Sequence, residues 1–173
     1  MTWCLVGSEM CIRDRSHPLP SGFQYSGIAC GIKNSGKPDL AMIVGDQPVV
    51  AAGVYTQNVV HAASIDWNRA RTPGAQIRGV VINSGNANAC TGEQGVADNE
   101  EFARLAATVL GSEPDQILVL STGIIGEPLP MDKISVGAQQ GGADLGADDA
   151  AFDRAALAIT TTDQFVKTAS RQI

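Results

Sequence analysis

Small polar residues gather at three places where apolar segments of the sequence end, and these residues are the best suited to chemistry. The three places are residues 83–92, 121–126 and 160–163. In Ser121-Thr122-Gly123 a hydroxyl stands beside a backbone N–H that no side chain crowds. Two such donors can converge on one point and stabilise the negative charge that develops on oxygen during acyl transfer. Taken alone, the tripeptide is more typical of a plain junction between a strand and a turn.

The other two places are less specific. Residues 83–92 hold three asparagines and two glycines, which could cradle an anionic group or could form a turn that caps itself. Both interpretations stay open, because the block matches neither the dinucleotide nor the P-loop pattern. The hydroxyls of Thr160, Thr161 and Thr162 could bind substrate or could cap the end of a helix.

A nucleophile is missing from this set. His17 and His61 lie in weakly patterned regions and no GxSxG motif is present, so no Ser-His-Asp arrangement is predicted. Cys90 is the one cysteine near the polar blocks, and a small buried cysteine is the more common role. The four cysteines include no CxxC pair, so no metal site is expected. The residues predict an oxyanion-binding pocket without an attacking group.

The composition excludes several classes of function. The chain has 173 residues, 44% of them hydrophobic, and a formal net charge of −6. An acidic chain without a basic stripe is a poor partner for nucleic acid. No run approaches the roughly 18 apolar residues that a membrane span needs. The expectation is a cytoplasmic, globular protein with reduced thiols and no membrane or nucleic-acid partner.

Strands and helices must position the polar blocks. Apolar runs bounded by turn residues predict antiparallel strands at 23–33, 40–44 and 49–56, and further strands at 77–83 and 116–120. Helical spacing predicts helices at 96–110, 131–139 and 148–159. Residues 59–71 are ambiguous, and 141–146 are expected to form a surface loop. Four lysines are expected on the solvated surface: Lys33, Lys37, Lys133 and Lys167. The pattern indicates one domain of mixed α+β class.

The first sixteen residues do not share this patterning. The run from Cys4 to Arg15 resembles the in-frame translation of a sequencing-library adapter. We therefore predict that residues 1–16 are a non-native segment without evolved function, and that the domain proper is 17–173. A genuine N-terminal strand is the alternative.

Several short sequence motifs occur along the chain in a fixed order. They lie at residues 22–33, 39–41, 51–58, 83–92, 121–126, 129–134 and 161–163. In this order they resemble the α-chain portion of the glutamate N-acetyltransferase (ornithine acetyltransferase) family of arginine biosynthesis. The Asn-rich block 83–92 and the run 121–134 are the most specific parts. The resemblance implies a layered sandwich of sheet and helices, shared with self-processing aminopeptidases.

The resemblance also implies a mechanism. Such proteins cleave their own precursor before a threonine, which becomes the N-terminal nucleophile of a β chain and uses its own amine as base. Acetyl moves from N-acetylornithine to this threonine and then to glutamate, and some members also accept acetyl-CoA. By resemblance, Thr122 and Gly123 form the oxyanion hole, and Thr161 binds substrate, with Thr162 as the adjacent alternative. No cofactor is implied, and the expected assembly is two α and two β chains.

The sequence departs from the family pattern at its C-terminal end. It stops at Ile173, which we expect to lie before the family's cleavage site, so we expect the nucleophilic threonine to be absent and this chain alone to be inactive. Lys167 comes too early to be the family's substrate-binding lysine. Two other functions remain as alternatives: a self-processing aminopeptidase or amidase, and an orphan chain that binds a small amino acid without catalysis.

Overall fold

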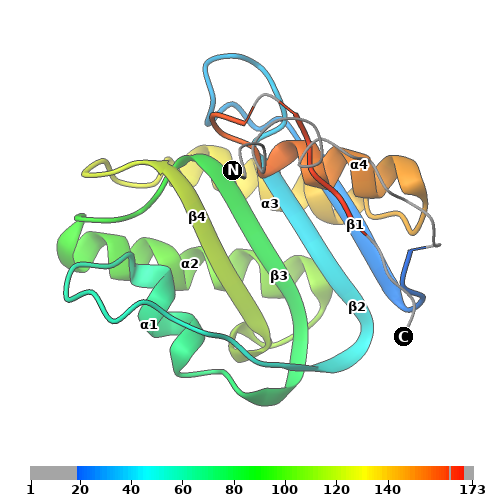
Figure 1. The fold of residues 1–173 in the computed structure, drawn as a ribbon, viewed down its shortest axis with the longest axis horizontal. Helices are drawn as coiled ribbons and strands as arrows, with labels where there is room; N and C mark the ends of the chain where they lie inside the picture. Colours follow the sequence, from blue (N-terminus) through cyan, green and yellow to red (C-terminus); the bar gives the residue numbers. More distant parts are fainter. Residues whose placement is uncertain (1–18, 164, 170–173) are drawn as a thin grey trace, which may run out of the picture.

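A single four-stranded sheet forms the centre of the computed structural model, which describes residues 19–163 and 165–169 (Figure 1). Its strands lie side by side in chain order: β1 (Phe23–Ile28), β2 (Leu40–Ala51), β3 (Gly74–Asn86) and β4 (Ile117–Ile124). β1, β2 and β3 pair antiparallel, whereas β4 runs parallel to β3. The mixed α+β class is confirmed, and the adapter-like segment 1–16 lies outside the described residues.

Helices cover the two faces of the sheet unequally. Helices α2 (Gly92–Leu110) and α3 (Met131–Ala143) pack on the face that carries Leu40, Met42 and Val44, and Figure 1 shows both behind the sheet. The alternate residues of β2 point to the other face, since side chains alternate along a strand. There Ala41 packs against α4 (Asp149–Ala158). Because α4 contacts β1 and β2, the same face of β3 and β4 is less well covered.

The short helix α1 (Ala63–Arg69) closes part of the outer edge of β4. The indole Nε1 of Trp67 donates to the carbonyl of Ile117 at 2.9 Å. The buried amide of Asn68 both donates to the carbonyl of Val119 (2.8 Å) and accepts its N–H (3.0 Å). This side chain therefore pairs with β4 as a neighbouring strand would. A helix of seven residues is too short to give a periodic signal, which explains why residues 59–71 were ambiguous.

The prediction of separate strands at 40–44 and 49–56 is wrong. β2 continues from Leu40 to Ala51, and its pairing with β3 shifts register between Val44 and Val49. The turn residues of 45–48 form a bulge instead of a reversal, because Val49 still pairs with Ile77 beyond it. Only β1 and β2 are the antiparallel neighbours that were expected, and β1 ends at Ile28 instead of residue 33.

Helix boundaries also differ from the expectation. α3 extends through Gly141 and Gly142, where a surface loop was predicted. A Cβ on Gly142 would lie 1.9 Å from Cγ1 of Val109, so this glycine lets α3 approach α2 closely. α2 begins at Gly92, four residues early, and ends as predicted at Gly111, whose φ of 61° closes the helix. The Asp148 side chain caps α4, and a 3₁₀ turn spans Pro114–Gln116.

Strands β3 and β4 are both longer than predicted. They include Asn83, Ser84 and Gly85 in β3, and Ser121, Thr122 and Gly123 in β4. The small polar residues are thus held in the ladder itself and not in turns behind it. Among residues 19–163 and 165–169, no helix has the length and apolar composition that crossing a bilayer requires.

Candidate active site

The backbone of β4 is regular up to the tripeptide Ser121-Thr122-Gly123 and becomes irregular at Gly123. Successive residues of a strand direct their N–H and C=O groups to opposite sides. Val119 directs its groups outward to α1, while the carbonyl of Ile124 faces β3 and accepts the N–H of Ala87 at 2.8 Å. At Gly123, between these two residues, the strand is irregular, because the register of β3 and β4 shifts at Gly85 and Asn86.

Only glycine fits at position 123. Its φ of +141° lies where side chains are rarely tolerated. A Cβ there would stand 2.3 Å from the carbonyl carbon of Gly85 and 2.5 Å from the nitrogen of Asn86. The preceding residue, Thr122, is half-buried, and its hydroxyl makes no hydrogen bond to any residue that the structure describes. The tripeptide thus presents a hydroxyl and an N–H in a fixed backbone.

A cavity of about 540 Å³ lies at this end of β3 and β4. Four segments of the chain line it, and together they supply Ile32, Lys33, Asn34, Ser35, Gly85, Thr122, Gly123, Ile124, Thr161 and Thr162. The structure therefore brings the sequence-predicted oxyanion residues Thr122 and Gly123 together with both predicted substrate-binding threonines. It also adds the loop between β1 and β2, which the motif analysis did not assign to the site.

A buried carboxylate shapes that loop. Asp39 is fully buried, and its oxygens accept the backbone N–H groups of Cys30 (2.8 Å), Gly31 (3.1 Å) and Lys33 (2.9 Å). The thiol of Cys30 also donates to Asp39 at 3.3 Å. Burial raises the pKa of the Cys30 thiol to about 12, and the neighbouring Asp39 carboxylate adds to the effect. This thiol is therefore a neutral hydrogen-bond donor and not a nucleophile.

Lys33 ties the loop to the segment that follows α4. Its ammonium donates to the carbonyls of Pro38 (3.0 Å), Thr160 (2.5 Å) and Ala158 (3.5 Å). The hydroxyl of Ser84 donates to the same Ala158 carbonyl. Figure 1 shows the loop and this segment next to each other above the sheet. The expectation that Lys33 is a solvated surface residue is wrong, since it is half-buried, and burial lowers its pKa.

The Asn-rich block holds the backbone together. Asn83 donates to the carbonyl of Asn86 at 2.8 Å, and Asn86 donates to the carbonyls of Glu127 and Pro128. Asn88 donates to the carbonyl of Gly95, 2.8 Å away. These amides are used within the chain, as the self-capping interpretation predicts. Among the ten residues of the block, Gly85 is the one that lines the 540 Å³ cavity.

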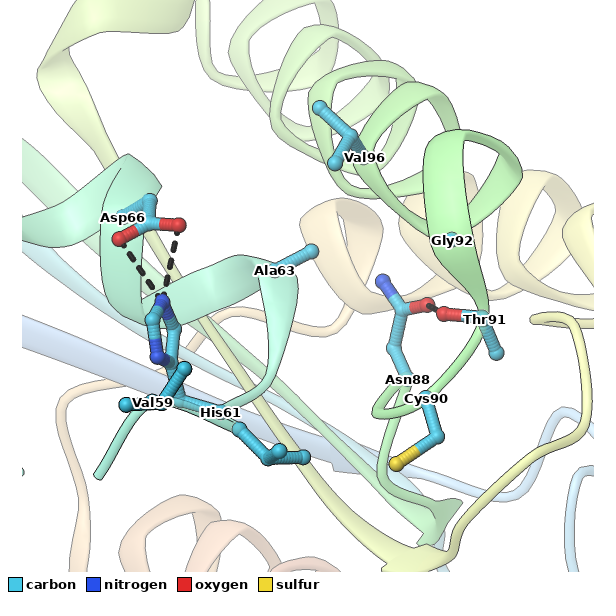
Figure 2. Close-up of a pocket in the computed structure, with 10 residues that line it drawn as sticks. Val59, His61, Ala63, Asp66, Asn88, Cys90, Thr91, Gly92 and Val96 are labelled. Carbon is cyan, nitrogen blue, oxygen red and sulfur yellow. Dashed lines mark hydrogen bonds and ion pairs between the residues drawn. The ribbon is translucent and has the colours of Figure 1, made fainter.

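A second cavity, of about 330 Å³, lies between α1 and the start of α2 (Figure 2). On one wall Nε2 of His61 contacts both carboxylate oxygens of Asp66, at 3.0 and 2.9 Å, which raises the pKa of His61. On the other wall Thr91 donates to Asn88 at 2.9 Å. Cys90 lines this cavity and is exposed, so the expectation of a buried cysteine is wrong. None of the predicted catalytic residues lies here.

Sequence reasoning missed the roles of Asp39 and Lys33. The sequence did contain a signal for Asp39. An acidic residue directly before the apolar run 40–44 must either be exposed to solvent or accept hydrogen bonds from nearby N–H groups. Nothing in the sequence singles out Lys33, whose acceptors at Ala158 and Thr160 are more than 120 residues away. Lys37 and Lys133 are exposed, as expected, and the Lys133 ammonium donates to the carbonyl of Gly31.

The fold is that of solved ornithine acetyltransferases. The ornithine acetyltransferase of Mycobacterium tuberculosis, complexed with ornithine, superposes with a TM-score of 0.81 at 40% identity, over 84% of this chain and 78% of that one. The arginine biosynthesis bifunctional protein ArgJ of Bacillus halodurans gives a TM-score of 0.78 at 35% identity, over 83% and 74% of the two chains.

Sequence comparison assigns the family. The profile of the ArgJ family matches residues 24–173. The bifunctional ArgJ protein of Rhodopirellula baltica is 47% identical over 158 residues, and that of Symbiobacterium thermophilum is 48% identical over 156. These alignments cover 91% and 89% of this chain, which spans 38% of the length of each relative. The chain belongs to the ArgJ family.

Proposed function

We propose that this chain is the α-chain portion of an acetyltransferase that moves acetyl from N-acetylornithine to glutamate in arginine biosynthesis. The observation that carries the proposal is the single cavity that joins Thr122 and Gly123 to Thr161 and Thr162. The names of the ArgJ relatives and of the ornithine acetyltransferase structure support the same reaction. In this proposal the enzyme acts in the cytoplasm.

The geometry of β4 suits the role of an oxyanion hole. When a nucleophile attacks the acetyl carbonyl, the carbonyl oxygen becomes negative, and fixed donors stabilise it without reorganising. We propose the Thr122 hydroxyl and the N–H of Gly123 as these donors, since the Thr122 hydroxyl has no hydrogen-bond partner among the described residues. Thr161, or the adjacent Thr162, then binds the substrate within the same cavity.

The nucleophile in this proposal is the N-terminal threonine of a β chain from the same precursor. Its hydroxyl oxygen bonds to the acetyl carbon, and its proton passes through the α-amine to the ornithine nitrogen as the C–N bond breaks. The amine of glutamate then attacks the threonyl ester, the bond between the acetyl carbon and the threonine oxygen breaks, and the proton lost by the glutamate amine passes through the α-amine to that oxygen. Acetyl-CoA is proposed as a further donor, and no cofactor is needed.

One face of the sheet is only partly covered by the described residues, and this supports a partner chain near the cavity. Val80 and Ile82 of β3 and Leu118 of β4 are only half-buried, and Leu120 is 43% exposed. These side chains lie on the face that α4 covers over β1 and β2, and by alternation Thr122 shares it. An apolar face beside a candidate site is a natural contact for a second chain. We propose the β chain there, in an α2β2 assembly.

The test is Thr122→Ala in the complete enzyme, with acetyl transfer from N-acetylornithine to glutamate as the assay. Loss of one oxyanion donor should lower kcat about 10²-fold or more. The matched control is Thr122→Ser, which retains the hydroxyl and should retain most of the rate. A change confined to KM would refute the oxyanion role of Thr122.

The same assay separates the alternatives. A self-processing amidase would hydrolyse peptide amides faster than it transfers acetyl from N-acetylornithine. A non-catalytic chain would be stabilised by a small amino acid with no turnover of either substrate. Transfer to glutamate in preference to water is the outcome that supports the acetyltransferase.

A further inference from the structure

The Lys33 ammonium is directed at main-chain acceptors, two of them at 2.5 and 3.0 Å and a third at 3.5 Å. An ammonium carries three N–H donors, and Lys33 has three carbonyl partners, on Pro38, Ala158 and Thr160. Although the residue lines the cavity, its charge is directed at the protein backbone. A cation at this place also complements the C-terminal end of α4, where carbonyl groups lack partners within the helix.

The backbone that carries Lys33 is itself fixed. The buried Asp39 carboxylate accepts the Lys33 N–H at 2.9 Å and two further N–H groups of the same loop. The base of the side chain is thus anchored on the β2 side of the cavity. Its tip is bound to the carbonyls that precede Thr161 and Thr162, which are exposed and belong to no helix or strand. The Ser84 hydroxyl donates to the Ala158 carbonyl as well. Within the segment itself, the Thr160 hydroxyl donates to the Leu157 carbonyl, and the Asp163 carboxylate accepts a hydrogen bond from the backbone of Thr161.

We infer that Lys33 is a positioning residue that holds the Thr161–Thr162 segment against the oxyanion tripeptide, and that it does not bind the substrate itself. This inference rests on the proposed function, because it explains what keeps Thr161 and Thr162 close to Thr122 and Gly123 in the proposed site. Thr161 and Thr162 follow α4 without a regular hydrogen-bond ladder of their own. Without Lys33, the contact of this segment with the rest of the site depends on Ser84 and on the end of α4, because the bonds of Thr160 and Asp163 are local to the segment.

The test compares Lys33→Met with Lys37→Met in the complete enzyme. Met retains most of the apolar stem and removes all three donors, while Lys37 is an exposed cation of the same loop that does not line the cavity. Both variants are assayed with N-acetylornithine and with its carboxamide, which lacks the substrate carboxylate. Hydrogen exchange of the peptide covering residues 158–163 is measured on the same proteins without substrate.

For Lys33→Met we expect a fall in kcat/KM of roughly 10- to 100-fold, as for a misplaced binding group. Most of this fall should appear in KM, because the oxyanion donors on β4 are untouched. Lys33→Met should lower kcat/KM by the same factor for N-acetylornithine and for its carboxamide. Equal factors mean that the effects of the Lys33 substitution and of the missing carboxylate are additive, as expected for groups that do not touch. Exchange in residues 158–163 should become faster, and Lys37→Met should match the parent in every measurement.

Three results would overturn the inference. If the penalty vanishes with the carboxamide, Lys33 binds the substrate carboxylate directly. If Lys33→Met equals Lys37→Met, or if exchange in 158–163 is unchanged, Lys33 does not hold the segment. The exchange result stands even if the parent enzyme fails to use N-acetylornithine, which would refute the proposed function alone. Should the Met variant not fold, Lys33→Gln, which retains a shorter two-donor head, must show the same changes more weakly.

Discussion

Replacing Gly123 with alanine tests whether the end of β4 depends on a bare backbone. At φ +141° an alanine sits in a sparsely populated region, at a cost of roughly 1–3 kcal/mol. Its Cβ would also stand 2.3 to 2.6 Å from backbone atoms of Gly85 and Asn86. These atoms belong to the central strand β3 and cannot rotate away, so overpacking adds roughly 1–3 kcal/mol. The expected loss is roughly 2–6 kcal/mol of unfolding free energy.

Gly126 provides the matched control. Its φ of +80° also disfavours a side chain, but no atom lies within 4 Å of the Cβ position. Gly126→Ala should therefore carry only the backbone cost, roughly 1–2 kcal/mol. Urea unfolding of the complete enzyme, followed by circular dichroism, compares the two variants by their midpoints.

The catalytic readout is kcat for acetyl transfer. If the N–H of Gly123 is an oxyanion donor, a β4 displaced by the new methyl group should lower kcat by about 10²-fold or more. The rate of Gly126→Ala should stay close to that of the parent. Equal unfolding midpoints for the two variants, together with an unaffected kcat in Gly123→Ala, would refute both the packing argument and the assigned role.

Two further predictions concern residues outside the cavity. Asn68→Ala removes both bonds that α1 makes to Val119 in a buried place, so urea unfolding should show a loss of about 2–4 kcal/mol; an unchanged midpoint would contradict this. In the folded protein iodoacetamide at pH 8 should alkylate the exposed Cys90 and spare Cys30, measured by mass spectrometry. Because the folded pKa of Cys30, about 12, exceeds the ordinary 9.0, the folded chain retains a proton that the unfolded chain releases. This contribution to stability is complete below pH 9 and is lost as the pH rises toward 12, and replacing Cys30 with serine should flatten that decline.

Local patterns in the sequence predicted elements well where one residue type decides the outcome. Gly111 ends α2 as expected, since an αL residue closes a helix regardless of the rest of the fold. The turn-like run 45–48 was wrongly predicted to reverse the chain. A bulge and a reversal use the same residue types, and only the pairing of Val49 with β3 decides between them. Gly142 was wrongly predicted to lie in a loop for a similar reason. This glycine is needed because α3 packs closely against Val109, and that contact belongs to tertiary packing.

The residues of the candidate site were likewise predicted only in part from the sequence. Thr122, Gly123, Thr161 and Thr162 were predicted through motifs that resemble a family, and the structure places all four around one cavity. Their assigned chemical roles remain predictions. The role of Lys33 was not predicted, because it depends on backbone carbonyl groups. Every residue has a carbonyl group, so no sequence pattern indicates which ones Lys33 will contact.

The parallel pairing of β3 with β4 has a consequence for the order of folding. The site requires Ser84 to lie beside Thr122, and the whole of α2 and a 3₁₀ turn lie between them along the chain. Contacts of such long range must overcome the entropy of closing a large loop, so they tend to form after the local hairpin contacts of β1 and β2. Thr122 and Gly123, the proposed oxyanion donors, should therefore gain their geometry only in the last stage of sheet formation. A nascent chain should carry this site in unassembled form until α2 has docked, however early its residues are synthesised.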